Sequence, residues 1–137
     1  MSFLLDTDTC VFWLRGRTTV RDHIDRVIEE LGAAALAISV VTLAELRYGA
    51  CYSDRPADNH QAIDGFVSGL TVLTSDQEAA SVFGQVKADL RRKGMPIEDL
   101  DLLIAATAKA HDLTLVTNNK ANFSRIAGLR LENWLES

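Results

Sequence analysis

Short runs of hydrophobic residues alternate along this chain with longer segments in which hydrophobic positions recur every three or four residues. The short runs predict buried strands, and the longer period predicts amphipathic helices. The expected strands lie at 3–5, 36–41, 71–73, 113–116 and 129–131. The expected helices lie at 10–14, 20–31, 42–50 and 63–70, then from Ser75 to before Gly94, from Asp99 to Ala108, and in a short turn at Asn122 and Phe123.

This alternation predicts an α/β fold. Strands that alternate with helices form a parallel sheet with helices on both faces. The segment 36–41 is apolar at nearly every position, as in a central strand of such a sheet. We therefore expect a central parallel sheet of about four to five strands. A length of 137 residues is close to that of one domain, so a single domain spanning 1–137 is expected.

Composition and charge narrow the class of protein. The chain is 47% hydrophobic and has a formal net charge of −5, which argues against a protein that coats nucleic acid through bulk charge. Cys10 and Cys51 have neither a disulfide framework nor zinc-site spacing, so both are expected to be small buried thiols. The N-terminus resembles no export signal, and no apolar stretch is long enough to cross a bilayer. A cytoplasmic protein with no membrane contact is the resulting expectation.

Polar residues gather where the predicted strands end. Ligands of open α/β sheets bind outside these carboxyl ends. Candidate site residues there are Asp6 and Asp8 after the first strand, Thr42 and Glu45 after the second, and Thr117, Asn118 and Asn119 after the fourth. Asp101 begins the helix before the fourth strand, and leucines flank it on both sides, so its carboxylate is expected to point inward.

Each acid also has an ordinary structural interpretation. Asp6 can cap the following helix. Thr42 and Glu45 fit a capping box, with Glu45 reaching back to the start of its helix. Asp101 in a first turn is favoured by the helix dipole. The two asparagines are typical of turns.

A cluster of carboxylates has a specific chemical use. If Asp6, Glu45 and Asp101 converge, their mutual repulsion is relieved by a divalent cation, and an all-oxygen ligand set suits Mg²⁺ or Mn²⁺. Such a site can activate water and offset the charge that grows at phosphorus. Phosphodiester hydrolysis follows, with phosphate contacts expected from nearby basic residues. These candidates are Arg15, Arg17, Arg47 and the run from Lys87 to Lys93. Phe12 and Trp13 are either core residues or a surface that stacks on a base or receives a protein partner.

Four segments together resemble the PIN-domain family, and in particular its VapC-type toxins of toxin–antitoxin pairs. They are Phe3–Asp8, Ser39–Leu46, Asp101–Ala106, and Val116–Asn119 with Asn122 and Phe123, in this order and spacing. The resemblance implies a Mg²⁺- or Mn²⁺-dependent endoribonuclease that cuts structured RNA such as tRNA. It also implies a homodimer and inhibition by a VapB-type antitoxin.

The resemblance assigns roles to individual residues. Asp6, Glu45 and Asp101 correspond to the acidic triad that binds metal and carries catalysis. Asp8 and Asn119 assist from the rim, and the hydroxyl and amide side chains at Thr42, Thr117 and Asn118 position phosphate or water. The family often has a fourth acid where this chain has Asn119, or one where it has Asn122, which puts a second metal ion in question. Attack by water with departure of the 3′ oxygen predicts 5′-phosphate and 3′-hydroxyl products.

Two other functions remain open from the sequence. Residues 6–9 also match the DxDx[TV] motif of haloacid-dehalogenase-like phosphatases, with Asp6 as nucleophile and Asp8 as acid. That interpretation leaves Glu45 without a role and lacks a second acid pair after a late strand. The third possibility is a non-catalytic module that only binds RNA or a partner. Asn119 and Asn122 favour it, because they stand where the family often has acids that bind metal.

Overall fold

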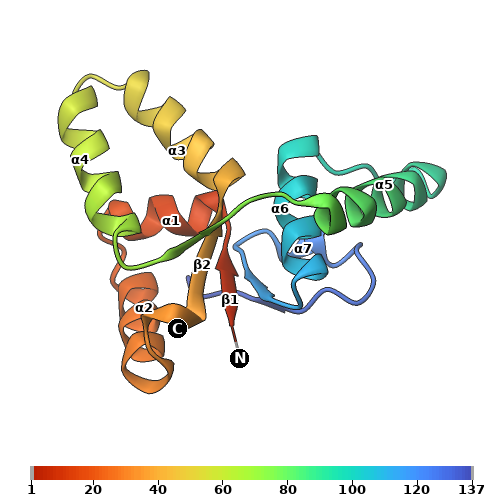
Figure 1. The fold of residues 1–137 in the computed structure, drawn as a ribbon, viewed down its shortest axis with the longest axis horizontal. Coiled ribbons are helices and arrows are strands. Elements are labelled where there is room, and N and C mark those ends of the chain that lie inside the picture. The colour runs from red at the N-terminus through yellow and green to blue at the C-terminus, as the bar shows by residue number, and fades with distance from the viewer. Residues whose placement is uncertain (1, 137) are drawn as a thin grey trace.

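The computed structural model describes residues 2–136, in which a twisted sheet of five parallel strands has the order β3-β2-β1-β4-β5 (Figure 1). The strands are β1 Phe3–Leu5, β2 Leu36–Ser39, β3 Thr71–Leu73, β4 Thr114–Val116 and β5 Leu131–Glu132. The helices are α1 Thr7–Leu14, α2 Thr18–Leu31, η1 Ala33–Ala35, α3 Val40–Cys51, α4 Pro56–Val67, α5 Gln77–Arg92, α6 Asp99–Ala110 and α7 Lys120–Phe123. The predicted α/β class and parallel sheet are confirmed. No helix in the described range is both long and apolar enough to cross a membrane.

The central strand β1 divides the sheet. It pairs in parallel with β2 on one side and with β4 on the other, through Phe3–Leu36 and Phe3–Thr114. The chain first builds outward through β2 and β3, and then returns to the other side of β1 for β4 and β5. The strand order therefore reverses beside β1, which is where ligands of this architecture bind.

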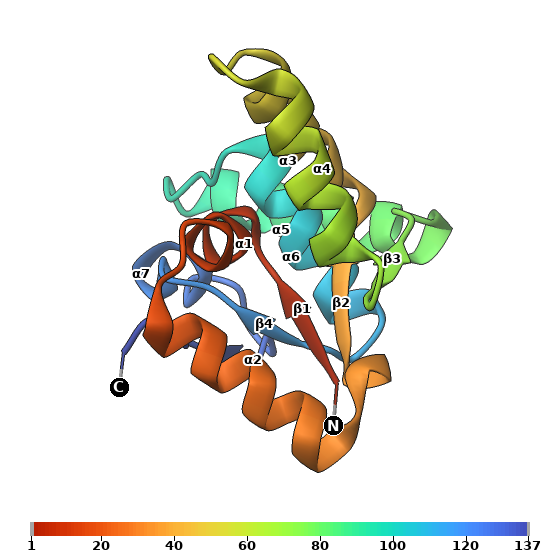
Figure 2. The ribbon, with the colours of Figure 1, turned by 90° about the vertical axis from the view of Figure 1, so that its left-hand side faces the viewer.

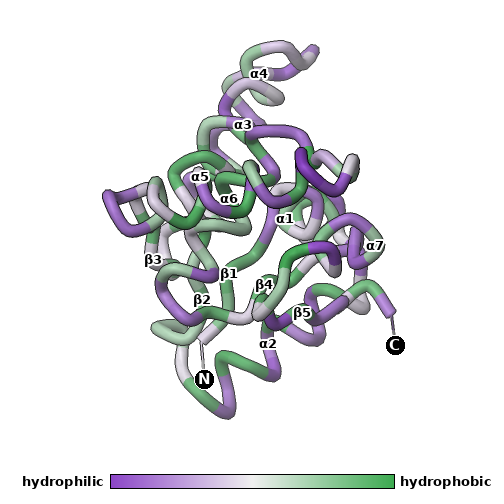
Figure 3. Tube along the Cα trace, turned by 90° about the vertical axis from the view of Figure 1, so that its right-hand side faces the viewer, coloured by the Kyte–Doolittle hydropathy of each residue, from purple (hydrophilic) through white to green (hydrophobic). Residues whose placement is uncertain are grey.

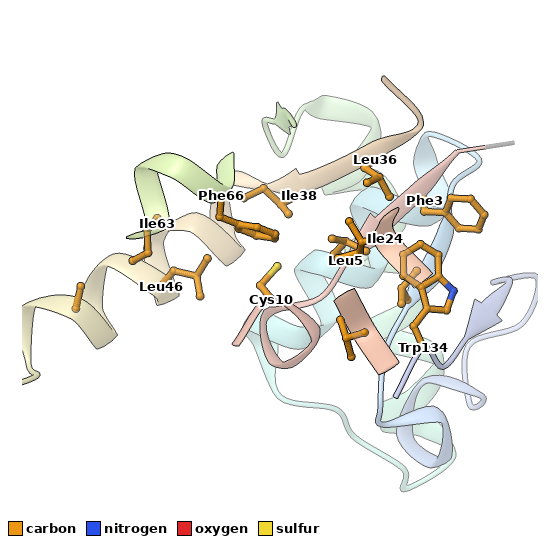
Figure 4. Packing of buried hydrophobic residues seen from close by; sticks show 13 residues of the cluster. Phe3, Leu5, Cys10, Ile24, Leu36, Ile38, Leu46, Ile63, Phe66 and Trp134 are labelled. Carbon is orange, nitrogen blue, oxygen red and sulfur yellow. The ribbon is translucent and has the colours of Figure 1, made fainter. Parts of the chain in front are cut away.

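Alternate residues of the central strands supply the two halves of the core. Phe3 and Leu5 face one side, where α1, α2 and the base of the α3–α4 pair cover them, together with Trp134 (Figure 4). Leu4 faces the other side, against α5, α6 and α7. Figure 3 shows the resulting hydrophobic character along β1. Since both faces are covered, the nearly continuous apolar sequence of these strands is explained.

The helices α3 and α4 form an antiparallel pair that extends beyond the sheet, on the side where the strands end (Figure 2). At its base, α3 follows β2 without any loop. Ser39 closes the strand in an extended conformation, and its Oγ accepts a hydrogen bond of 3.0 Å from the backbone N–H of Thr42. The start of α3 is thus fixed directly to the end of a central strand.

This junction corrects two expectations. The strand ends at Ser39 rather than at residue 41, because the serine hydroxyl caps a helix that already begins at Val40. Thr42 is therefore inside the helix, and the predicted capping box of Thr42 and Glu45 is wrong. The carboxylate of Glu45 has another partner, described below.

Four further expectations need correction. The helix α5 begins at Gln77 rather than at Ser75, because Asp76 caps it by accepting a hydrogen bond from the N–H of Ala79. The last strand lies at 131–132 instead of 129–131, and α4 spans 56–67 instead of 63–70. Cys10 is buried as expected, whereas Cys51 is exposed at the end of α3.

The cap at Ser39 should contribute measurably to stability. Replacing Ser39 with alanine leaves the Thr42 N–H without its acceptor, and we expect the free energy of unfolding to fall by about 1–2 kcal/mol. Urea denaturation measures the change. The matched control is Ser68→Ala on the exposed end of α4, which should change the value by less than about 0.5 kcal/mol. Equal effects from the two variants would contradict the role given to Ser39.

Candidate active site

The candidate site lies at the carboxyl ends of the strands, beside the point where the strand order reverses. Asp6 directly follows β1, and Asn119 follows β4, the neighbouring strand. Glu45 comes from the second turn of α3, and Asp101 from the first turn of α6. Four segments that are distant in sequence therefore meet at one place.

Asp6 is the most buried of the acids, with only 6% of its surface exposed. Its side chain caps α1 by accepting a 2.9 Å hydrogen bond from the N–H of Thr9, so the structural role expected for it is real. Burial raises the pKa of Asp6, and the hydrogen bonds from Thr117 and Thr9 partly offset this by favouring the carboxylate. The capping bond fixes the carboxyl group while leaving it on the wall of the site.

Glu45 is held through a threonine of α1. The hydroxyl of Thr7 donates a 2.7 Å hydrogen bond to Oε1 of Glu45. The same hydroxyl lies 3.1 Å from the hydroxyl of Thr42, which is fully buried one turn earlier on α3. Two threonines thus fix the Glu45 carboxylate across the junction between α1 and α3.

Asp101 is half-buried, and its environment disfavours a negative charge. Desolvation raises the pKa of Asp101 to about 6, with further contributions from the charges of Glu98 and Glu45 and smaller ones from Asp6 and Asp8. A raised pKa in a cavity lined by like charges is typical of a functional site. Its neighbour Asp99 points elsewhere and forms an exposed ion pair of 2.8 Å with Lys87.

A small cavity of about 70 Å³ joins these groups. Its lining residues are Asp6, Thr7, Asp8, Glu45, Asp101, Asn119 and Phe123. The polar atoms that these side chains can offer to a ligand are all oxygens, except for the amide nitrogen of Asn119. This chemistry fits a hard divalent cation with water in its shell, and the volume leaves room for both.

The carboxylates share the cavity without forming a closed ligand set. Within residues 2–136, no three acidic, histidine or cysteine side chains are arranged closely enough to surround one metal ion. Glu45 is engaged by Thr7, and Asp6 by the start of α1. The donor set therefore suits an ion such as Mg²⁺ that keeps several waters and takes few direct protein ligands.

The remaining predicted site residues divide into two groups. Thr117 is buried and hydrogen-bonds the Asp6 side chain, while its Oγ1 accepts from the N–H of Asn119 at 2.9 Å. Asn118 is exposed and directs its Oδ1 to Asn133 at 3.1 Å, away from the residues that line the cavity. Asn122 does not line the cavity either, so of the two asparagines in question only Asn119 does.

Sequence reasoning missed Thr7 and Phe123. Phe123 closes the cavity from α7. Thr7 lies between two candidate acids, and its position at the start of a helix beside Asp6 was the available signal. Trp13, by contrast, packs on Phe66 with ring centroids 4.6 Å apart, so it belongs to the core.

Of the basic candidates, Arg15 shares a groove with one of the acids, Glu45. It lines a second, largely apolar groove between α1, α3 and α4, and Thr7 and Glu45 line this groove as well as the cavity. Arg47 is committed to Asp64 and His60 between α3 and α4. Arg17 lies over the ring of Phe12.

The chain is similar to known proteins over nearly its whole length. The family model of the PIN domain matches residues 3–129. The tRNA(fMet)-specific endonuclease VapC of Salmonella typhimurium is 42% identical, and the alignment covers 98% of each chain. Ribonuclease VapC2 of Rickettsia felis is 37% identical, again over 98% of each chain.

Solved structures give the same result. VapBC2 from Rickettsia felis, bound to a DNA fragment from its promoter, matches with a TM-score of 0.91 and 34% identity, covering 98% of this chain and 99% of that one. DNA-bound VapBC from Salmonella typhimurium matches with a TM-score of 0.89 and 39% identity over 98% of each chain. With a family model over nearly the whole length and full-length relatives above 30% identity, the chain belongs to the PIN-domain family and, within it, to the VapC ribonucleases.

Proposed function

We propose that this chain is a Mg²⁺- or Mn²⁺-dependent endoribonuclease that hydrolyses structured RNA, with tRNA as its substrate class. The observation that carries the proposal is the convergence of Asp6, Asp8, Glu45 and Asp101 on one small cavity at the carboxyl ends of the strands. Glu45 has no place in the alternative phosphatase mechanism, yet it lines the same cavity as Asp6. The nuclease therefore accounts for all four acids.

The cation would be held by Asp6, Glu45 and Asp101, directly or through water. When bound, a divalent cation supplies an activated water and neutralises the charge that develops at phosphorus. Asp8 is exposed at the rim and adds negative charge without burial. Asn119 contributes a neutral amide, which accepts from water or donates to a phosphate oxygen.

The protein's own residues orient the reacting groups. Thr7 holds the Glu45 carboxylate at 2.7 Å, and Thr117 and Thr9 hold Asp6, so neither acid has to be ordered when RNA arrives. Preorganised groups of this kind lower the barrier because no reorganisation occurs during the reaction. Attack by water in line with the 3′ oxygen leaves a 5′-phosphate and a 3′-hydroxyl.

The names of the relatives narrow the substrate and the partner. The Salmonella relative is named for cleavage of tRNA(fMet), and the two solved neighbours are VapBC toxin–antitoxin complexes. For this chain we propose the same substrate class, tRNA, and inhibition by a VapB-type antitoxin. We further propose that it acts as a homodimer in the cytoplasm, where tRNA is found. The apolar groove beside Glu45, about 340 Å³ in volume, suits an antitoxin segment because an occupant there also reaches the cavity.

The test is a cleavage assay with mapped ends. Purified chain, freed of antitoxin, is mixed with total tRNA and with ribosomal RNA in the presence of Mn²⁺, Mg²⁺ or EDTA. We expect discrete cuts in tRNA that require metal and leave 5′-phosphate and 3′-hydroxyl ends. A 2′,3′-cyclic phosphate would contradict the mechanism, since it means that the ribose 2′-hydroxyl attacks instead of water.

The same purified protein distinguishes the nuclease from the phosphatase and from the non-catalytic binding module. Turnover of p-nitrophenyl phosphate that Asp8→Asn abolishes, without RNA cleavage, would favour the phosphatase. A folded chain that neither cuts RNA nor binds Mn²⁺ would favour a binding module, and Asn119 would then be the first residue to replace with an acid.

A further inference from the structure

Two exposed tyrosines at the C-terminal end of α3, Tyr48 within the helix and Tyr52 as its C-cap, have no role in the core. Tyr48 is 68% exposed and Tyr52 is 82% exposed, and their rings stack on each other with centroids 5.9 Å apart and planes 15° apart. They are the only exposed aromatic side chains in residues 2–136. Large rings are normally buried, so a stacked pair in solvent suggests a binding surface.

The position of the pair links it to the site. Tyr48 and Tyr52 follow Glu45 by three and seven residues, and on a helix with 3.6 residues per turn both lie within roughly 60° of the direction of Glu45. The rise along the helix axis is about 4.5 Å to the first ring and about 10.5 Å to the second. The rings thus form a line that begins at a cavity carboxylate and runs outward along α3.

Other residues at this end of α3 belong to a different surface. Gly49, Ala50 and Ser53 line the apolar groove between α3 and α4, whereas neither tyrosine does. Glu45 lies between the two surfaces and lines both the groove and the cavity. An antitoxin segment confined to the groove would therefore not contact the tyrosine rings.

We propose that Tyr48 and Tyr52 form a stacking platform for unpaired bases of the RNA next to the bond that is cut; this inference rests on the proposed ribonuclease function. An RNA chain whose phosphate occupies the cavity continues beyond it, and bases splayed out of a loop stack on aromatic side chains. Every base has a π face, so such a platform selects single-stranded segments rather than a particular sequence.

The net charge of the chain disfavours RNA, so a ribonuclease built on it needs local contacts to hold its substrate. A net charge of −5 provides little general attraction for phosphates. Binding must then draw on local contacts, and stacking on exposed rings is strong enough to supply a large share of the affinity. Tyr48 and Tyr52 are positioning residues in this scheme, because they hold the substrate and do not touch the reacting phosphate.

The experiment measures RNA binding where cleavage is blocked. In an Asp101→Asn background, a fluorescein-labelled single-stranded RNA of mixed sequence, about 12 nucleotides long, is titrated in EDTA. We expect Tyr48→Ala and Tyr52→Ala each to raise the Kd roughly 5- to 100-fold, and Tyr→Phe at either position to change it less than about twofold, since the ring remains. The matched control is Leu31→Ala, which removes an exposed apolar side chain at the last residue of α2. Circular dichroism checks that each variant folds.

Further measurements separate the outcomes. In the active chain with Mn²⁺, the alanine variants should raise KM more than they lower kcat. An unchanged Kd in both alanine variants would overturn the platform. So would a sedimentation result in which Tyr48→Ala converts a dimer to a monomer, because the rings would then be covered by a second copy. Loss of binding in the variants of a chain that never cleaves RNA would overturn the proposed function and leave the platform standing.

Discussion

Replacing Asp101 with asparagine is expected to lower the rate of RNA cleavage by about a thousandfold or more, while raising the midpoint of thermal unfolding. Asparagine keeps the shape of the side chain and removes its charge. The charge is needed to hold a cation. When catalytic groups act as a unit, removing one of them typically lowers the rate by several orders of magnitude. Initial rates on tRNA and a thermal melt measure the two effects.

The gain in stability follows from the pKa of Asp101, which is raised to about 6 in the folded chain. An acid whose folded pKa is raised binds its proton more tightly when folded than when unfolded. The free energy of unfolding therefore falls as the pH rises from about 4 to about 6, and stays reduced above that range. The asparagine variant carries no such charge, so its melting temperature should exceed that of the parent chain at pH 7.5 and approach it near pH 4.

The neighbouring acid provides the control. Asp99 begins the same helix but forms an exposed ion pair with Lys87 and does not line the cavity. Asp99→Asn should change the cleavage rate less than about twofold, since exposed ion pairs contribute little. If the Asp101→Asn variant retained a tenth or more of the parent activity, Asp101 would not be one of the catalytic groups.

The position of the site could be predicted from the sequence because topology determines it. In a parallel sheet, whatever follows the strands meets at one edge, so Asp6, Glu45 and Asn119 could be grouped before any coordinates. Asp101 does not follow a strand. It could be included because leucines on both sides of it indicate that its carboxylate faces inward. The first turn of its helix also lies at the edge of the sheet where the strands end.

The details that failed depend on single hydrogen bonds. An apolar run through Val40 and Val41 looks like a continuing strand, yet the hydroxyl of Ser39 starts a helix there. The bond from Thr7 to Glu45 joins residues 38 positions apart, and no local pattern reports it. Asn118 and Asn119 are identical neighbours whose side chains face different partners, a difference that only the backbone after β4 determines.

Removal of divalent metal is expected to reduce cleavage to background, and addition of Mn²⁺ is expected to stabilise the fold in a manner that depends on pH. At pH 7.5 Asp101 is ionised, and a saturating concentration near 100 times the Kd should add about 2.7 kcal/mol, or roughly 10 °C in melting temperature. Below a pH of about 6 the proton competes with the ion for Asp101. The stabilisation at pH 5.5 should therefore be clearly smaller, and the cleavage rate should fall with it.

The comparison of Mn²⁺ with Ca²⁺ and with Asp101→Asn makes the test specific. Ca²⁺ prefers six to eight oxygen ligands, more than this small cavity offers, so its stabilisation should be weaker than that of Mn²⁺. In Asp101→Asn the Mn²⁺-induced rise in melting temperature should largely disappear at both pH values. An equal rise in the variant would mean that the ion binds elsewhere on the chain, and the acids at the ends of the strands would then need another explanation. A rise that is lost in the variant and reduced at pH 5.5 would tie ion binding to the carboxylate whose pKa the cavity raises.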